Sequence, residues 1–142
     1  MSIQNYSDQE LLLKTKNLIR EEQKLLSVIL SHLEVIERRR LYCDLGYSSL
    51  FDYCLKELRY SEQQAWRRIN SMRVIKKLPE LKHNVDDGTL SLSNVNLASS
   101  LFKDAKINSR EKQLEIFEEI KNTTKQECEE KIFELKRDYG VL

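Results

Sequence analysis

The sequence predicts an all-α protein, and three observations lead to this prediction. Hydrophobic residues make up 40% of the 142 residues and charged residues 33%, a composition typical of helices with a solvated outer side. With three Gly and one Pro, the chain has few positions for tight hairpin turns. Serine and threonine residues stand at capping positions, just before segments with helical periodicity. We therefore expect one helical domain over residues 1–142.

Residues 1–45 are expected to contain one long helix of more than thirty residues, or two nearly collinear helices. Ser7 and Glu10 have the spacing of a capping box, in which the serine caps the helix and the glutamate returns a hydrogen bond. From there to about Tyr42, no Gly or Pro interrupts the chain. We expect the helix to stop at Leu45-Gly46, with Gly46 as a left-handed cap.

Two adjacent apolar rows run along this helix. One row recurs every seven residues, at Leu12, Ile19, Leu26 and Leu33. Beside it stand Leu11, Leu18, Leu25, Ile29 and Ile36. Rows of this kind pack on other helices or on a second copy of the same helix, so we expect a homodimer through the N-terminal helix.

Residues 47–102 are expected to form a helix-turn-helix-like core. A short helix from Ser49 to about Leu58 is followed by a three-residue turn at 59–61, which lacks the Gly often found there. The next helix opens with a capping box, Ser61-Glu62-Gln63-Gln64, and closes at Pro79. Two more helices follow, one over 80–86 before Gly88 and one over 92–102 capped by Ser91.

A C-terminal helical pair is expected over residues 103–142. Ser109 caps a helix that runs to about Lys121. Thr124 and Glu127 form a third capping box, which opens a last helix to about Asp138. No segment has the pattern of a strand.

The positive charge is concentrated in one segment, although the net charge of the chain is +1. Residues 56–77 carry an excess of five positive charges, while the segments on either side are nearly balanced. The basic residues of the 56–77 segment are Lys56, Arg59, Arg67, Arg68, Arg73, Lys76 and Lys77, and its acidic residues are Glu57 and Glu62. A basic segment on a helix-turn-helix is typical of a DNA-binding surface.

The second helix of this motif supplies the candidate DNA-binding residues. If Ala65, Ile69 and Met72 face the core, Gln63, Arg67, Asn70 and Val74 lie on the far side, with Gln64 and Ser71 adjoining. Gln, Asn and Arg can each bond two atoms of one base, so we expect base contacts from Gln63, Gln64, Arg67 and Asn70. Cations nearby hold phosphates, and our candidates are Arg59, Arg68, Arg73, Lys76 and Lys77. The same helix could instead be a solvated outer face, and we expect Trp66 to pack rather than to bind.

The sequence offers no catalytic or metal-binding constellation. Cys43, Cys54 and Cys128 are odd in number and lack C-x-x-C spacing, so we expect buried, reduced thiols. His32 and His83 have no Cys or His partner at ligand spacing. No Gly-rich phosphate loop, G-x-S-x-G or H-E-x-x-H motif occurs. We expect no enzyme activity, no metal or other cofactor and no small-molecule substrate.

The apolar runs are too short to suggest membrane insertion. No stretch of about 18 apolar residues is present, so we expect no transmembrane span. The first ten residues, MSIQNYSDQE, lack the basic and apolar regions of a signal peptide. We expect a cytoplasmic protein.

The central part of the chain resembles the N-terminal helical region of bacterial HNH endonucleases. The resemblance covers about residues 10–135 and is carried by RLY at 40–42, GYSSLF at 46–51, YC at 53–54, SEQQAWRRI at 61–69 and GTLSL at 88–92. It implies a helical accessory region that engages DNA or assembles with other helices. In that family a metal-binding nuclease module follows, but this chain ends at Leu142 without one. The resemblance therefore implies no nuclease activity.

A looser similarity is to the helix-turn-helix of ParB and KorB partition proteins. It is carried by Leu78-Pro79 after the second helix and by the Gly-x-Leu-Ser segment at 88–91, with about one extra turn between Ser61 and Pro79. The leading hypothesis is thus a non-enzymatic DNA-binding protein. The alternative is a helical protein–protein interaction or dimerisation module without DNA binding, which could partner a nuclease carrying the same region.

Overall fold

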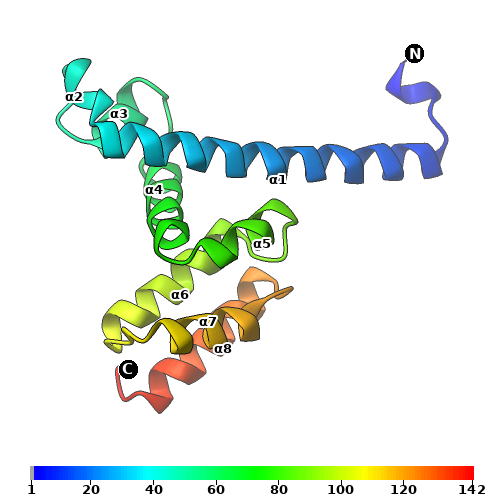
Figure 1. Ribbon diagram of the computed structural model, residues 1–142. Helices are drawn as coiled ribbons and strands as arrows, with labels where there is room; N and C mark the ends of the chain where they lie inside the picture. Colours follow the sequence, from blue (N-terminus) through cyan, green and yellow to red (C-terminus); the bar gives the residue numbers. More distant parts are fainter. Residues whose placement is uncertain (1) are drawn as a thin grey trace.

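The computed structural model describes residues 2–142, and all regular structure in this part of the chain is helical (Figure 1). The all-α prediction is confirmed. The elements are η1 (Ile3–Asn5), α1 (Asp8–Arg39), α2 (Leu41–Asp44), α3 (Leu50–Lys56), α4 (Glu62–Lys77), η2 (Pro79–Leu81), α5 (Lys82–Asp86), α6 (Leu92–Asp104), α7 (Arg110–Ile120) and α8 (Lys125–Asp138).

α4 is the central helix of the fold. It packs against α1 on one side, α6 on another and α3 on a third, while α7 and α8 pack on α6 (Figure 1). One apolar cluster joins these layers, with Leu33 from α1, Ile69 from α4, Leu101 from α6, Phe117 from α7 and Ile132 from α8 each at most 3% exposed. Because α4 contacts α1, α3 and α6 and also η2, only part of its circumference faces solvent.

α1 extends beyond the body of the molecule. Its C-terminal half packs on α4 and α5, whereas every residue from Asp8 to Glu22 is exposed (Figure 1). We call residues 8–22 the α1 arm. Charged residues are spread along α1, and among residues 2–142 no helix is both long and apolar enough to cross a membrane.

The predicted end of the long helix was wrong. α1 ends at Arg39, because Arg40 adopts a left-handed conformation with φ 54° and its N–H donates to the carbonyls of Ile36 and Glu37. The chain then forms the separate helix α2, and Gly46 takes its own left-handed conformation after it. The left-handed Gly46 is thus confirmed, but it follows α2, and Arg40 is the left-handed residue at the end of α1.

The predicted helix starts agree with the structure. Every predicted cap accepts a hydrogen bond from a first-turn N–H, namely Ser7, Ser49, Ser61, Ser91, Ser109 and Thr124. The capping boxes at Ser61 and Thr124 are complete. At Ser7 the structure has only the serine half of the box, in which the hydroxyl accepts from the N–H of Glu10.

Candidate nucleic-acid interface

α3 and α4 are the two helices of the predicted helix-turn-helix, and the turn between them is longer than expected. α3 ends at Lys56 rather than near Leu58, which leaves five residues before α4. Arg59 is left-handed with φ 62°, the conformation that Gly supplies in many such turns, and Tyr60 N–H donates to the carbonyl of Cys54 at 3.0 Å. The Arg59 side chain is exposed on the turn.

The two helices pack through small and aromatic residues. Cys54 of α3 and Ala65 of α4 are fully buried. The rings of Phe51 and Trp66 stack, with centroids 4.4 Å apart and planes 18° from parallel. Trp66 therefore has the packing role expected from the sequence. It also remains 46% exposed, so one side of its ring system is open to solvent.

One narrow face of α4 is open to solvent. It consists of Gln63, Trp66, Asn70, Arg73 and Lys77, spaced three and four residues apart along the helix. We call these residues the α4 stripe. Asn70 is partly buried and the other four are exposed. The stripe thus combines two predicted base contacts, Gln63 and Asn70, with two predicted phosphate contacts, Arg73 and Lys77.

The side of α4 next to this stripe is covered by α6. Ser71, which we expected to adjoin the outer face, is fully buried. The side-chain amide of Asn96 donates to Ser71 Oγ at 2.9 Å, to the carbonyl of Arg67 at 3.0 Å and to that of Leu92 at 2.8 Å. The expected outward position of Ser71 was wrong, because α6 packs on a part of α4 that helical periodicity alone left open.

Gln64, a predicted base contact, is engaged in the helix cap. The side-chain Oε1 of Gln64 accepts a hydrogen bond from the backbone N–H of Ser61 at 3.1 Å. The backbone N–H of Gln64 donates to Ser61 Oγ at 3.2 Å. The side chain is exposed but held at the start of α4, outside the α4 stripe. Rotating Gln64 toward a base would break the cap.

Two of the predicted phosphate contacts are paired with carboxylates of α1. Arg73 donates to Glu37 through Nη2 at 2.8 Å and Nε at 3.3 Å, and this hydrogen bonding raises the pKa of Arg73. Lys76 Nζ lies 3.7 Å from Oε1 of Glu34. Glu34 and Glu37 therefore offset part of the positive charge that the sequence concentrates on α4.

The side chains of Arg68 and Lys77, both on α4, have different surroundings. The Arg68 guanidinium lies over the Tyr60 ring, 4.5 Å from its centroid, and its Nε is buried without a hydrogen-bond partner among residues 2–142. The Lys77 side chain is exposed, and its carbonyl accepts a hydrogen bond from Arg110 Nη1 at 2.8 Å. Arg110 also pairs with Glu80. Among residues 2–142 no carboxylate pairs with Lys77 at the end of the α4 stripe, while Arg68 is part of the packing.

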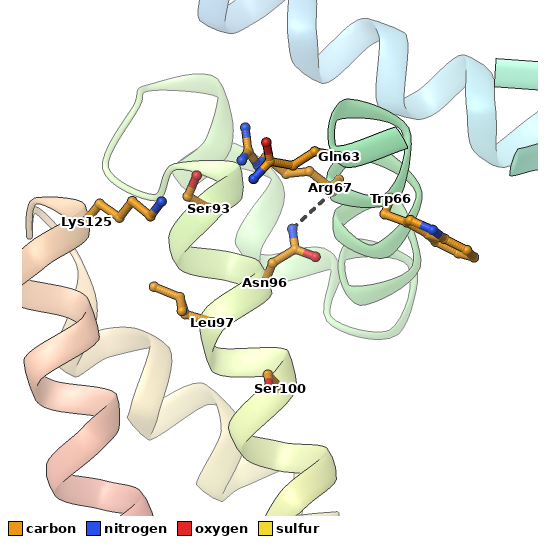
Figure 2. A pocket seen from close by; sticks show the side chains of 8 residues that line it. All are labelled: Gln63, Trp66, Arg67, Ser93, Asn96, Leu97, Ser100 and Lys125. Carbon is orange, nitrogen blue, oxygen red and sulfur yellow. Dashed lines mark hydrogen bonds between the residues drawn. The ribbon is translucent and has the colours of Figure 1, made fainter. Parts of the chain in front are cut away.

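A hollow of about 400 Å³ lies between α4, α6 and the start of α8 (Figure 2). It is lined by Gln63, Trp66, Arg67, Ser93, Asn96, Leu97, Ser100 and Lys125. We call it the α4–α6–α8 groove. Arg67, predicted from the sequence as a base contact, is partly buried and lines this groove rather than the α4 stripe.

Lys125 and Ser93 were not selected from the sequence. The capping box at Thr124 places Lys125 at the first position of a helix, which was recognisable. Nothing in the local sequence indicates that this helix start lies beside α4, about sixty residues earlier in the chain. That proximity follows because α4 and α8 both pack on α6.

No protein-family model, curated protein or solved structure matches this chain. The resemblance of residues 10–135 to the helical region of HNH endonucleases stays a prediction. The candidate interface is therefore defined by the geometry of α3, α4, α6 and α8 alone.

The expectation that all three thiols are buried was wrong for one of them. Cys54 and Cys128 are fully buried, and burial raises the pKa of each to about 11. Cys43 is exposed on α2. The early end of α1 explains the difference, because it places Cys43 in a separate short helix with no buried residue.

Proposed function

We propose that the protein is a non-enzymatic DNA-binding protein that presents the α4 stripe to the major groove. The observation that carries the proposal is the stripe itself. Gln63 and Asn70 are two amide side chains that can each pair with adenine, and they stand two helical turns apart on the open face. Arg73 and Lys77 continue the same face with positive charge.

The stripe has dimensions that suit a DNA groove. From Gln63 to Lys77 it spans about 21 Å along the helix axis at 1.5 Å per residue. A major groove about 12 Å wide admits one α-helix, and the N-terminal end of a recognition helix is the part that usually meets the bases. Gln63 lies in the first turn of α4, and Arg59 lies on the turn that precedes it.

Ion pairs offset only part of the positive charge of α4 and of the turn before it. No carboxylate of residues 2–142 forms an ion pair with Arg59, Arg67 or Lys77. Binding to phosphates would release the counterions of the DNA, so affinity should fall steeply with salt concentration.

The test begins with selection of binding sites from a random duplex library, followed by fluorescence anisotropy on the enriched sequence. We expect Gln63→Ala/Asn70→Ala to lose the sequence preference, at a cost of about 1–3 kcal/mol for each lost base contact. The matched control is Gln9→Ala/Asn17→Ala, which changes the same residue types on the exposed α1 arm. Absence of duplex binding by the wild type at low salt would overturn the proposal.

A second candidate function, association through α1, is supported by the α1 arm. Leu11, Leu18 and Leu25, one of the two rows predicted from the sequence, are exposed by 42%, 63% and 60%. Leu12 and Ile19 of the other row are exposed by 67% and 47%. Further along α1, Leu26 and Leu33 of the same row pack into the core. Exposed apolar rows with a seven-residue repeat are typical of helix–helix interfaces.

We propose a second copy of the chain as the occupant of this face. Lys14 and Glu21 lie one heptad apart on the same flank of the leucine row. In an antiparallel pair of arms, Lys14 of each copy would oppose Glu21 of the other, so the interface is complementary to itself. Such a dimer would also carry two helix-turn-helix units for two half-sites.

Sedimentation equilibrium tests the dimer. We expect a dimer for the wild type and a monomer for Leu11→Glu/Leu18→Glu. The control is Leu45→Glu, which introduces the same charge at a leucine that is 60% exposed outside α1. A wild-type monomer at about 100 μM, a concentration well above that of most specific associations, would contradict the dimer proposal.

A further inference from the structure

The polar side chains of the α4–α6–α8 groove gather at one end. Figure 2 shows the Lys125 amine, the Ser93 hydroxyl and the ends of Gln63 and Arg67 grouped near the starts of α8, α6 and α4. Leu97 and Ser100 continue the groove along α6, and Trp66 is also among its lining residues, with its ring directed away from the polar end in Figure 2. The groove therefore has a cationic end and a largely apolar floor.

This surface has no negative side chain. The chain contains 23 acidic residues, yet none lines the groove. A second hollow shares Arg67 and Ser93 with the groove, and its lining also contains no carboxylate. Lys125 has a carboxylate nearby in Glu129 at 3.9 Å, but both groups are at least half exposed, so solvent weakens the pair. Arg67 and Lys125 thus supply the positive charge of the groove.

The α4–α6–α8 groove is also continuous with the α4 stripe. Gln63 and Trp66 belong to both. A strand that passes Gln63 in a major groove would bring its sugar–phosphate backbone to the edge of the stripe. Backbone contacts at such an edge fix the register of a recognition helix, and they are made mainly by Arg, Lys and hydroxyl side chains.

We propose that the α4–α6–α8 groove holds the backbone of the bound DNA, with Arg67 and Lys125 on phosphate oxygens and the Ser93 hydroxyl donating a hydrogen bond. This inference rests on the proposed function and deepens it. It moves Arg67 from base contact to phosphate contact and adds Lys125 and Ser93 to the interface. It also makes α6 and α8 part of the binding surface, because they supply two of the three phosphate ligands.

The first test measures how binding to the selected duplex depends on salt. Each neutralised phosphate contributes about 0.9 to the slope of log affinity against log salt. We expect Arg67→Gln and Lys125→Gln each to make the slope shallower by about one, and the double variant by about two. The matched control is Lys112→Gln. Lys112 is also an exposed lysine near a helix start, its Nζ lies 3.5 Å from a glutamate carboxylate, and it lines neither hollow. Thermal melting monitored by circular dichroism checks that the variants remain folded.

A second readout uses Trp66, which is the only tryptophan of the chain. Because Trp66 borders the groove, we expect its fluorescence to change when the duplex binds, and the change to weaken in the Arg67→Gln/Lys125→Gln variant. Wild-type binding with salt slopes that the variants leave unchanged would overturn the groove assignment and leave the proposed function standing.

The absence of any duplex binding would overturn both proposals together. Inorganic pyrophosphate then serves as the probe in the same fluorescence titration. A Trp66 response to pyrophosphate without DNA binding would identify a site for a free anion, which contradicts the assignment to the DNA backbone. No response to either probe would leave the groove without an anion-binding role and refute the inference.

Discussion

Arg73 of α4 and Glu37 of α1 form a two-point ion pair where the two helices cross, with Nη2–Oε2 and Nε–Oε1 distances of 2.8 and 3.3 Å. Arg73 belongs to the open stripe of α4, so the carboxylate of Glu37 lowers the positive potential of the proposed DNA surface. A carboxylate at this position would also repel a phosphate that approaches Arg73.

We therefore expect Glu37→Gln to strengthen DNA binding. Removing one negative charge at the rim of the interface should raise affinity at low salt by about two- to fivefold, an effect typical of a partly exposed charge. Fluorescence anisotropy at about 50 mM salt, where screening is weak, measures the change. Glu130→Gln on α8 removes an exposed carboxylate elsewhere and serves as the control. Equal or weaker binding by Glu37→Gln would show that Arg73 does not contact DNA.

The Asn96 side chain holds α6 against α4, and we expect Asn96→Ala to destabilise the fold. The substitution removes the side-chain amide that donates to buried Ser71 Oγ and to the carbonyl of Arg67. Loss of a partner for buried polar groups costs about 1–3 kcal/mol. Urea denaturation measures the change in the free energy of unfolding, with Asn108→Ala at an exposed position as the control. A change no larger than that of the control would show that solvent replaces these hydrogen bonds.

The three thiols should differ in reactivity. Cys43 is exposed, whereas Cys54 and Cys128 are fully buried. Ellman's reagent is therefore expected to titrate one thiol per folded chain quickly, and all three in denaturant. Cys43→Ser should remove the fast reaction altogether. Rapid reaction of a second thiol in the native state would mean that α3 or α8 opens readily.

The buried thiols also predict how stability depends on pH. Burial raises the pKa of Cys54 and Cys128 to about 11, while thiols in an unfolded chain ionise near pH 8.5. Between these values the unfolded chain releases protons that the folded chain retains, so the free energy of unfolding falls as pH rises. Urea denaturation between about pH 8 and 11 measures this slope, and Cys54→Ala/Cys128→Ala should flatten it. An unchanged slope in that variant would assign the pH dependence to other groups.

Local chemistry made the helix starts predictable. A serine or threonine before an apolar periodic segment satisfies first-turn N–H groups wherever the segment later packs, so six helix starts could be located from the sequence. The end of α1 was harder to predict from the sequence. Arg40 and Arg59 adopt left-handed conformations that intrinsic preference assigns to glycine, and only the surrounding structure makes these conformations favourable.

The candidate site was only partly predictable, for a different reason. Periodicity correctly placed Ala65, Ile69 and Met72 on the buried side of α4. It could not show that α6 covers a second side, which buries Ser71 and turns Arg67 into the wall of a groove. The pairing of Arg73 with Glu37 likewise joins residues 36 positions apart. Exposure of a polar residue on a central helix depends on tertiary packing, which local patterns do not contain.

The arm of α1 has a consequence for the energetics of the chain. Residues 8–22 have no buried side chain, so their backbone hydrogen bonds depend on the helix itself, and a helical stretch of about 15 residues is only marginally stable in water. Amide hydrogen exchange should thus be much faster in the arm than in the part of α1 that packs on α4. A partner that covers the leucine row would slow this exchange. In this segment, association and local folding would be a single event, and its binding affinity would include the free energy of forming the helix.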